Sequence, residues 1–137
     1  MKRLLAVAAV FTALTGQAMA APVEVEVANV QSSTGKVYLA LFDQAGWDAY
    51  EPVAAKVLPV SADGVSASFE GLAPGQYAIR IFQDVNGNGE LDLGQYRIPV
   101  EPYGFSNDAP VMMGPPSWKN AVFEVTGEGA RQRITLR

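Results

Sequence analysis

The sequence of 137 residues contains no cysteine and no histidine. Without cysteine, the protein cannot form a disulfide, a zinc or iron–sulfur site held by thiolates, or a thiol nucleophile. Without histidine, it lacks the most frequent general base, the Ser-His-Asp arrangement of many hydrolases, and the usual ligand of zinc and copper. What remains is the chemistry of carboxylate, amide and carbonyl oxygens, which suits hard cations such as calcium.

Long hydrophobic runs are also scarce, and the one that stands out lies at the amino terminus. Two positive residues precede an eleven-residue apolar run at 4–14, and Ala-Met-Ala at 18–20 has the form of a cleavage site. This pattern predicts a secretory signal peptide over residues 1–20. An uncleaved anchor or a buried helix fits less well, because a membrane span needs about 20 apolar residues. We therefore expect a periplasmic or secreted protein with no membrane span.

Positive charge is in short supply once that segment is removed. Residues 1–20 carry two basic side chains and no acid, so the remaining 117 residues, 21–137, have a net charge of −6. Such a balance disfavours nucleic acid and anionic membrane surfaces as partners. A chain of this length forms one domain of ordinary size.

Glycine and proline separate short segments of β-strand character, and no segment has a sustained helical period. Strands are expected at 23–27, 36–42, 56–60, 65–69, 77–81, 121–125 and 133–136. A short helical turn near 47–51 would end at Pro52. About seven strands separated by turns predict an all-β fold, a single antiparallel β-sandwich. A long irregular region, 84–119, follows the fifth strand, and such regions in compact domains usually bind something.

A turn signal stands just before the fifth strand. Pro74 fixes the first central position of a type II turn, and Gly75 is expected to take a positive φ at the second, so that Tyr77 begins the strand. The stretch Leu-x-Pro-Gly-x-Tyr at 72–77 resembles the transthyretin-like, or prealbumin-like, sandwich modules. That resemblance concerns the fold and not the function.

The loop at 84–92, Asp-Val-Asn-Gly-Asn-Gly-Glu-Leu-Asp, carries oxygen ligands at alternate positions. Aligned with the EF-hand calcium loop, its ligands would be the side chains of Asp84, Asn86, Asn88 and Asp92 and the backbone carbonyl of Glu90. Gly89 falls where that loop must turn sharply, which brings alternate oxygens toward one point. The spacing therefore predicts a calcium site.

The calcium loop is incomplete by the EF-hand standard. Position 12, a bidentate glutamate in that motif, is Gln95 here, and a strand precedes the loop instead of a helix. Glu101 is the nearest carboxylate that could complete the site, and Asp108 is the next. With few charges we expect a dissociation constant on the order of 10⁻⁴ to 10⁻³ M, or a smaller one if Glu101 joins the site. The alternative is a metal-free turn, because Asn-Gly at 86–87 and again at 88–89 favours hairpins tied by Asx hydrogen bonds.

Five motifs run through the second half of the chain. They are Tyr-Ala-Ile at 77–79, Phe-Gln-Asp-x-Asn-Gly-Asn-Gly-x-Leu-Asp at 82–92, Ile-Pro-x-Glu-Pro-Tyr-Gly-Phe-Ser-Asn at 98–107, Pro-Ser-Trp at 116–118 and Ala-x-Phe at 121–123. Together they resemble a secreted bacterial family, domain of unknown function 2141. The resemblance implies a small exported β-sandwich with an Asp/Asn-rich loop and no settled function. This chain departs from the usual pattern at Gln83, in place of His, and at Lys119 and Asn120, in place of acids.

Aromatic and methionine side chains are concentrated at 103–118, within a stretch rich in glycine and proline. Tyr103, Met112 and Met113 belong to this group. One interpretation is an apolar or sugar-stacking surface beside the loop. The other, which we favour, is a long connection pinned to the core by large side chains, chiefly Phe105 and Trp118.

These features suggest three functions. The leading hypothesis is an exported, non-enzymatic, calcium-binding module that binds an envelope or extracellular partner, either a protein or a glycan. The second is a purely structural envelope module without metal. The third is a hydrolase that uses carboxylate pairs drawn from Asp84, Asp92, Glu101 and Asp108. The third fits less well, because amides stand between the acids as in a ligand set and no nucleophile is paired with a base.

Overall fold

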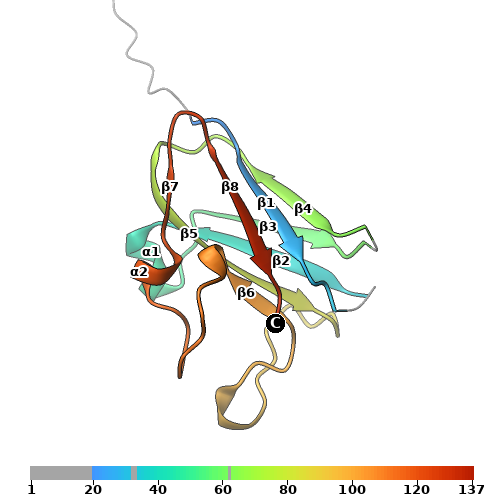
Figure 1. Cartoon of the computed structure of the whole chain (residues 1–137). Coiled ribbons are helices and arrows are strands. Elements are labelled where there is room, and N and C mark those ends of the chain that lie inside the picture. Colours follow the sequence, from blue (N-terminus) through green and yellow to red (C-terminus); the bar gives the residue numbers. More distant parts are fainter. Residues whose placement is uncertain (1–19, 32–33, 62) are drawn as a thin grey trace, which may run out of the picture.

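The structure, a computed structural model, describes residues 20–31, 34–61 and 63–137, and these form two packed β-sheets (Figure 1). The predicted signal peptide therefore lies outside the described residues except for Ala20. Ala20 is buried, and its N–H donates to the carbonyl of Leu72 at 3.0 Å. Among the described helices, none has the length and apolar character needed to cross a membrane.

Eight strands build the two sheets, and the predicted β-sandwich is confirmed. The smaller sheet has the order β4-β1-β8, and the larger has the order β3-β2-β5-β6, with β7 also paired to β5. The strands are β1 (Val23–Ala28), β2 (Lys36–Phe42), β3 (Ala54–Pro59), β4 (Val65–Phe69), β5 (Gly75–Asp84), β6 (Tyr103–Phe105), β7 (Phe123–Val125) and β8 (Ala130–Thr135). Two short helices, α1 (Gln44–Ala49) and α2 (Trp118–Ala121), pack beside β5.

The core lies between the sheets and follows from strand alternation. In β1, the valines at 23, 25 and 27 are buried and the glutamates between them are exposed, because successive side chains point to opposite faces. The other buried aliphatic members include Val37, Leu39, Leu41, Ile79, Ile81, Ile134 and Leu136. Each sheet thus buries one face of its strands against the other.

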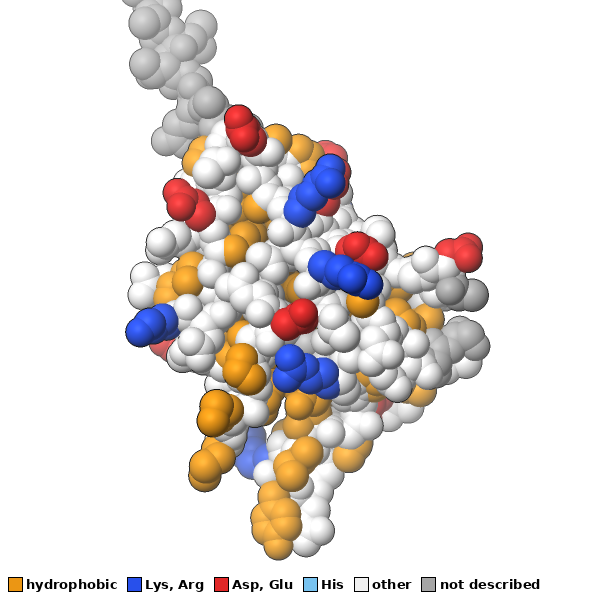
Figure 2. All heavy atoms as spheres, in the orientation of Figure 1, with side chains coloured by type: hydrophobic (Ala, Val, Ile, Leu, Met, Phe, Trp, Pro, Cys, Tyr) orange, Lys and Arg blue, Asp and Glu red, His pale blue; other side chains and the backbone are white. Residues whose placement is uncertain are grey.

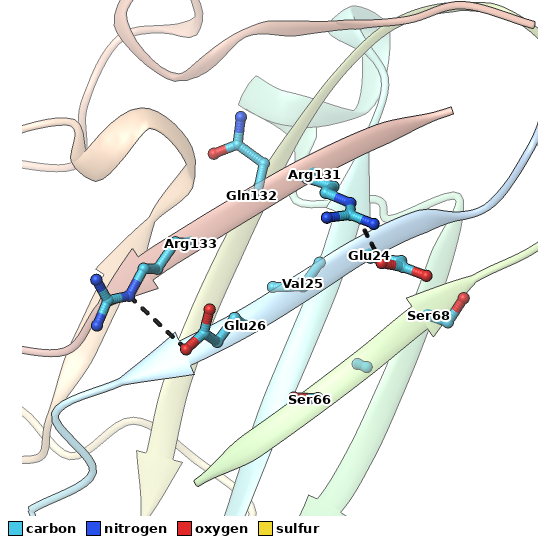
Figure 3. Close-up of a pocket in the computed structure, with 9 residues that line it drawn as sticks. Glu24, Val25, Glu26, Ser66, Ser68, Arg131, Gln132 and Arg133 are labelled. Carbon is cyan, nitrogen blue, oxygen red and sulfur yellow. Dashed lines mark ion pairs between the residues drawn. The ribbon is translucent and has the colours of Figure 1, made fainter. Parts of the chain in front are cut away.

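The outer face of the smaller sheet is charged (Figure 3). Glu24 pairs with Arg131 at 3.5 Å and Glu26 with Arg133 at 3.8 Å, each across the β1–β8 register. These side chains are largely exposed, so each pair contributes only about 0–1 kcal/mol. A solvated polar face of this kind is ordinary for a sheet that buries its other side.

A second apolar cluster covers one end of the outer face of the larger sheet. Its buried members are Phe42, Trp47, Ala78, Ala109 and Ala121. Trp47 comes from α1, which begins earlier than predicted because the Asp43 side chain accepts the N–H of Gly46 at 2.8 Å as a cap. The helix ends before Pro52, where Tyr50 takes a left-handed conformation.

Two features of the topology differ from the expected pattern. β8 pairs with β1 in parallel, whereas the other strand pairs are antiparallel. The region 84–119 also contains an eighth strand, β6, which pairs with β5 and bonds through Tyr103 to the backbone of Arg137. β6 therefore joins the two sheets along one side of the sandwich.

The turn before β5 is formed differently from the prediction. The positive φ belongs to Gly71, at 72°, and not to Gly75, which is the first residue of β5. The hydroxyl of Tyr77 donates to the carbonyl of Ala73 at 2.6 Å and closes the corner. The predicted strand at 121–125 is likewise shorter, because Ala121 ends α2 and β7 starts at Phe123.

Candidate metal site

The loop begins at Asp84, the last residue of β5, whose side chain is only 1% exposed. Its Oδ1 accepts the N–H of Gly87 at 3.0 Å, and its Oδ2 accepts the N–H of Gly89 at 2.8 Å. Gly89 has a φ of 78°, so the tight curl that the spacing predicts is present. The carboxylate of Asp84 thus faces the inside of the loop.

Two asparagines continue the curl. Asn86 Oδ1 accepts the N–H of Asn88 at 3.2 Å, and Asn88 Oδ1 accepts the N–H of Glu90 at 3.0 Å. An amide oxygen has two lone pairs, so each oxygen retains one for a further contact. Both amide nitrogens donate to the Asp92 carboxylate, that of Asn88 at 2.6 Å. Asp92 therefore closes the loop opposite Asp84.

Glu101 reaches the base of the loop from further along the chain. Its Oε2 accepts the N–H of Asp92 at 3.2 Å, and the N–H of Val100 donates to the carbonyl of Asp92 at 2.9 Å. Glu101 is 7% exposed, and its Oε1 is buried with no hydrogen-bond partner within the described part of the chain. The carboxylate predicted to complete the site is thus held next to it.

The loop has no cationic side chain to balance its acids. The ion pairs found among residues 20–31, 34–61 and 63–137 are the two on the smaller sheet, and neither involves Asp84, Asp92 or Glu101. Buried carboxylates without a counter-charge are costly. No set of three or more Asp, Glu, His or Cys side chains in the described residues is arranged to hold a metal ion. A cation here would therefore also need the amide and carbonyl oxygens of the loop.

Two other residues that were predicted as metal ligands, Asp108 and Glu90, do not direct their side chains to the loop interior. Asp108 Oδ1 accepts the N–H of Thr135 at 2.8 Å, so this side chain is tied to the end of β8. The side chain of Glu90 is exposed. Glu90 would therefore contribute to a metal site only through its backbone carbonyl, as predicted. Gln95 lies in the exposed turn Gln95–Arg97 of the hairpin that follows the loop.

Gln83 has a structural role in this chain. Its side chain is fully buried; Oε1 accepts the N–H of Gln31 at 3.1 Å and Nε2 donates to the carbonyl of Thr34 at 3.3 Å. Because Gln83 and Asp84 are successive strand residues, their side chains point to opposite faces of the sheet. Gln83 therefore ties the segment before β2 to β5 and does not face the loop.

The aromatic segment has two parts with different environments. Phe105 and Trp118 pack against Trp47, with ring centroids 6.4 and 6.1 Å apart, so the interpretation of a connection pinned by large side chains holds for them. Met112 and Met113 are exposed. Tyr96, Ile98 and Val100 of the hairpin are exposed as well. Hydrophobic side chains gather at the lower end of the molecule in Figure 2.

Arg80 is a residue of interest that the sequence interpretation missed. It lies in β5, where its guanidinium carbon is 3.8 Å from the ring centroid of Trp47 and 4.1 Å from that of Tyr50. The signal was a single charged residue in an otherwise apolar strand segment, Tyr-Ala-Ile-Arg-Ile-Phe at 77–82. Its surroundings depend on α1, which strand periodicity does not predict.

Comparison with curated proteins and with solved structures gave no match. A bacterial family, domain of unknown function 2141, matches residues 25–133, and its description reads "uncharacterized protein conserved in bacteria". The match spans nearly all of the sandwich, from β1 into β8, and includes the loop with Glu101. The chain therefore belongs to the family called domain of unknown function 2141.

Proposed function

We propose that the protein is an exported, non-enzymatic β-sandwich module that binds one calcium ion at the loop and uses it to shape a binding surface. The ligands would be the side chains of Asp84, Asn86, Asn88, Asp92 and Glu101 and the carbonyl of Glu90. The partner would be an envelope or extracellular protein or glycan. The segment at 1–20 supports export to the periplasm or beyond, because it has the three parts of a signal peptide.

The observation that carries the proposal is the environment of Glu101. Its Oε1 is buried and has no hydrogen-bond partner among the residues that the structure describes, and the Asp84 carboxylate of the neighbouring loop is also buried. An unpaired buried carboxylate oxygen costs free energy, and a divalent cation at this position would offset that cost. Calcium suits the set, because it accepts six to eight oxygen ligands of mixed type in a flexible arrangement.

A structural module without metal is the second candidate, and the amide groups favour it. The side-chain nitrogens of Asn86 and Asn88 donate to Asp92 and close the loop without an ion. Calcium binding would use the oxygens of these amides and of Asp92 as ligands, at the expense of these two hydrogen bonds. The two candidates therefore predict different responses to calcium.

Thermal unfolding of the purified protein in calcium and in chelator separates the candidates. A ligand that binds only the folded state at ten times its dissociation constant adds about 1.4 kcal/mol to the free energy of unfolding. For a chain of this size, that is a rise of several degrees in melting temperature. We expect such a rise in about 10 mM calcium, and no rise would contradict the proposal.

A matched pair of variants assigns the effect to the loop. Asp92→Asn removes the negative charge of a proposed calcium ligand. Glu124→Gln neutralises an exposed acid on β7, outside the loop. We expect Asp92→Asn to lose most of the calcium-induced rise and Glu124→Gln to retain it. Equal responses of the two variants would mean that calcium acts through the net charge of the protein and not at the loop.

A further inference from the structure

The outer face of the larger sheet carries aromatic side chains, whereas the outer face of the smaller sheet carries charged ones. Across the strands, Tyr38 of β2 stands opposite Phe82 of β5, and Phe82 stands opposite Tyr103 of β6. The rings of Tyr38 and Phe82 stack with centroids 4.9 Å apart and planes within 8°. An aromatic face on the solvent side of a sheet marks an interaction surface.

A hollow of about 410 Å³ lies on this face. The row of residues next to the Tyr38–Phe82 pair forms the floor of the hollow. In this row, Ala40 of β2 pairs with Ala55 of β3 on one side and with Arg80 of β5 on the other. Small side chains there leave space between the Tyr38–Phe82 pair and the rings of Phe42 and Tyr50, which also line the hollow. This volume lies at the lower end of the range for ligand-binding pockets and suits a ligand with a single ring.

The calcium loop forms one wall of the same hollow. Gly89, Glu90 and Leu91 all line it. Tyr38 connects the two features, since its hydroxyl lies 3.8 Å from the position that a Cβ on Gly89 would take. Ordering of the loop by an ion would therefore also order this wall.

Arg80 supplies a positive charge that forms no ion pair with the described residues. Its Nη2 donates to the carbonyl of Trp47 at 2.7 Å, while its Nε and Nη1 are buried without hydrogen-bond partners among the described residues. Three aromatic rings, from Phe42, Trp47 and Tyr50, surround its guanidinium group. Such rings stabilise a cation but accept few of its hydrogen bonds. Because these nitrogens are enclosed, Arg80 acts on a ligand in the hollow through its positive charge, which favours a carboxylate there.

The rim of the hollow is polar, whereas most of its lining is apolar. Tyr38, Tyr50 and Tyr103 line it, and their hydroxyls make no hydrogen bond within the described chain. The Glu90 side chain is also exposed there. A sugar ring has the matching form, because one face presents C–H groups and its periphery presents hydroxyls. A ring with only apolar atoms would leave these rim groups unused.

We propose that this hollow binds a uronic acid unit, a sugar ring that carries a carboxylate, either free or at the end of a glycan. The ring packs between the Tyr38–Phe82 pair and Tyr50, and the positive charge of Arg80 attracts the carboxylate. This inference deepens the proposed function and rests on it in one respect, the calcium dependence conferred by the loop wall. The sugar chemistry itself follows from the sheet face and Arg80.

Titration of the full chain with glucuronate, followed by NMR shifts of aromatic protons, tests the proposal. Glucose is the matched neutral sugar, since it differs in the carboxylate alone. We expect glucuronate to bind at least tenfold more tightly than glucose. Equal affinity for the two sugars, or no binding of glucuronate in saturating calcium, would overturn the proposal. A glucuronate-ended disaccharide that binds more tightly than the free acid would identify a glycan end as the ligand.

Two variants locate the site, and a third serves as the control. Ala55→Phe fills the hollow from the exposed edge strand β3, and Ser66→Phe places the same side chain on the exposed face of edge strand β4. We expect Ala55→Phe to abolish binding and Ser66→Phe to leave it unchanged. Arg80→Gln should reduce the affinity for glucuronate to that for glucose. Retained binding in Ala55→Phe would contradict the location.

The same titration in chelator separates this proposal from the calcium proposal. We expect weaker glucuronate binding without calcium, because the loop wall is then less ordered. If calcium raises the melting temperature but glucuronate does not bind, the sugar proposal alone fails. If glucuronate binds equally with and without calcium and calcium does not change the melting temperature, sugar binding in the hollow is supported and the calcium proposal fails.

Discussion

The carboxylate of Glu101 and the main chain of Asp92 are joined by a hydrogen bond, Oε2 to N–H, of 3.2 Å. The two residues are nine positions apart in the sequence, and the chain between them forms a hairpin that begins and ends at this contact. The contact uses one oxygen of Glu101 and leaves the other buried beside the loop. The site therefore depends on a residue outside the continuous Asp/Asn motif.

Replacing Glu101 with glutamine should separate its structural contribution from its charge. Glu101→Gln retains an oxygen for the N–H of Asp92 but removes a negative charge that forms no ion pair within the described part of the chain. We expect its free energy of unfolding in chelator to equal or exceed that of the natural protein by up to about 1 kcal/mol. In calcium, we expect the stabilisation to be lost. Denaturant unfolding in both buffers measures this, and a loss of more than about 2 kcal/mol in chelator would contradict it.

Gly35 should be needed for the position of the loop. A Cβ at this residue would lie 2.0 Å from the carbonyl oxygen of Asp84, and its φ is 87°. Gly64 has a similar φ of 98° but open space around it. Alanine at Gly64 should therefore cost only the backbone penalty of about 1–2 kcal/mol. We expect Gly35→Ala to cost clearly more and to weaken the response to calcium, and equal costs in denaturant unfolding would show that no close approach exists.

Ser106 should contribute more to stability than its size suggests. Its fully buried hydroxyl accepts the N–H of Ile79 at 3.0 Å and donates to the carbonyl of Ala121, so it joins β5 to the end of α2. Ser106→Ala leaves two buried groups unpaired, at about 1–3 kcal/mol each. Ser66→Ala, at an exposed site, should change the free energy of unfolding by less than about 0.5 kcal/mol. Equal effects in the two variants would mean that water replaces the hydroxyl.

Export should remove residues 1–20. When the full chain is produced in a bacterial host, we expect the protein in the periplasm or medium to begin at Ala21. Intact mass and amino-terminal sequencing measure this directly. Ala18→Arg places a large charged residue in the cleavage motif and should block processing. Recovery of the uncleaved natural chain from the cytoplasm would contradict the prediction.

Strands with strong local alternation could be predicted from the sequence. The expected segment 36–42 coincides with β2, and the valines at 23, 25 and 27 fixed the buried face of β1. β6 was missed because it has three residues, with a glycine in the middle, and is held by its partners β5 and β8. The parallel pairing of β1 and β8 is likewise decided by packing between distant segments and has no local signal.

The candidate site was predictable to the extent that it is local. The curl of residues 84–92 follows from the spacing of short polar side chains and from Gly89. The nearness of Glu101 was predicted from distance along the chain, and the hairpin accounts for it. The hollow beside the loop was not predicted, because it depends on cross-strand neighbours such as Ala40 and Ala55 and on Tyr50 at the end of α1.

Calorimetric titration of the metal-free protein with calcium measures binding at the loop itself. We expect one saturable site per chain, with a dissociation constant on the order of 10⁻⁴ to 10⁻³ M for the loop alone and a smaller one where Glu101 joins it. The same titration of Glu101→Gln should show weaker binding. Absence of saturable heat up to about 10 mM calcium would contradict calcium binding at the loop and identify the loop as a metal-free turn.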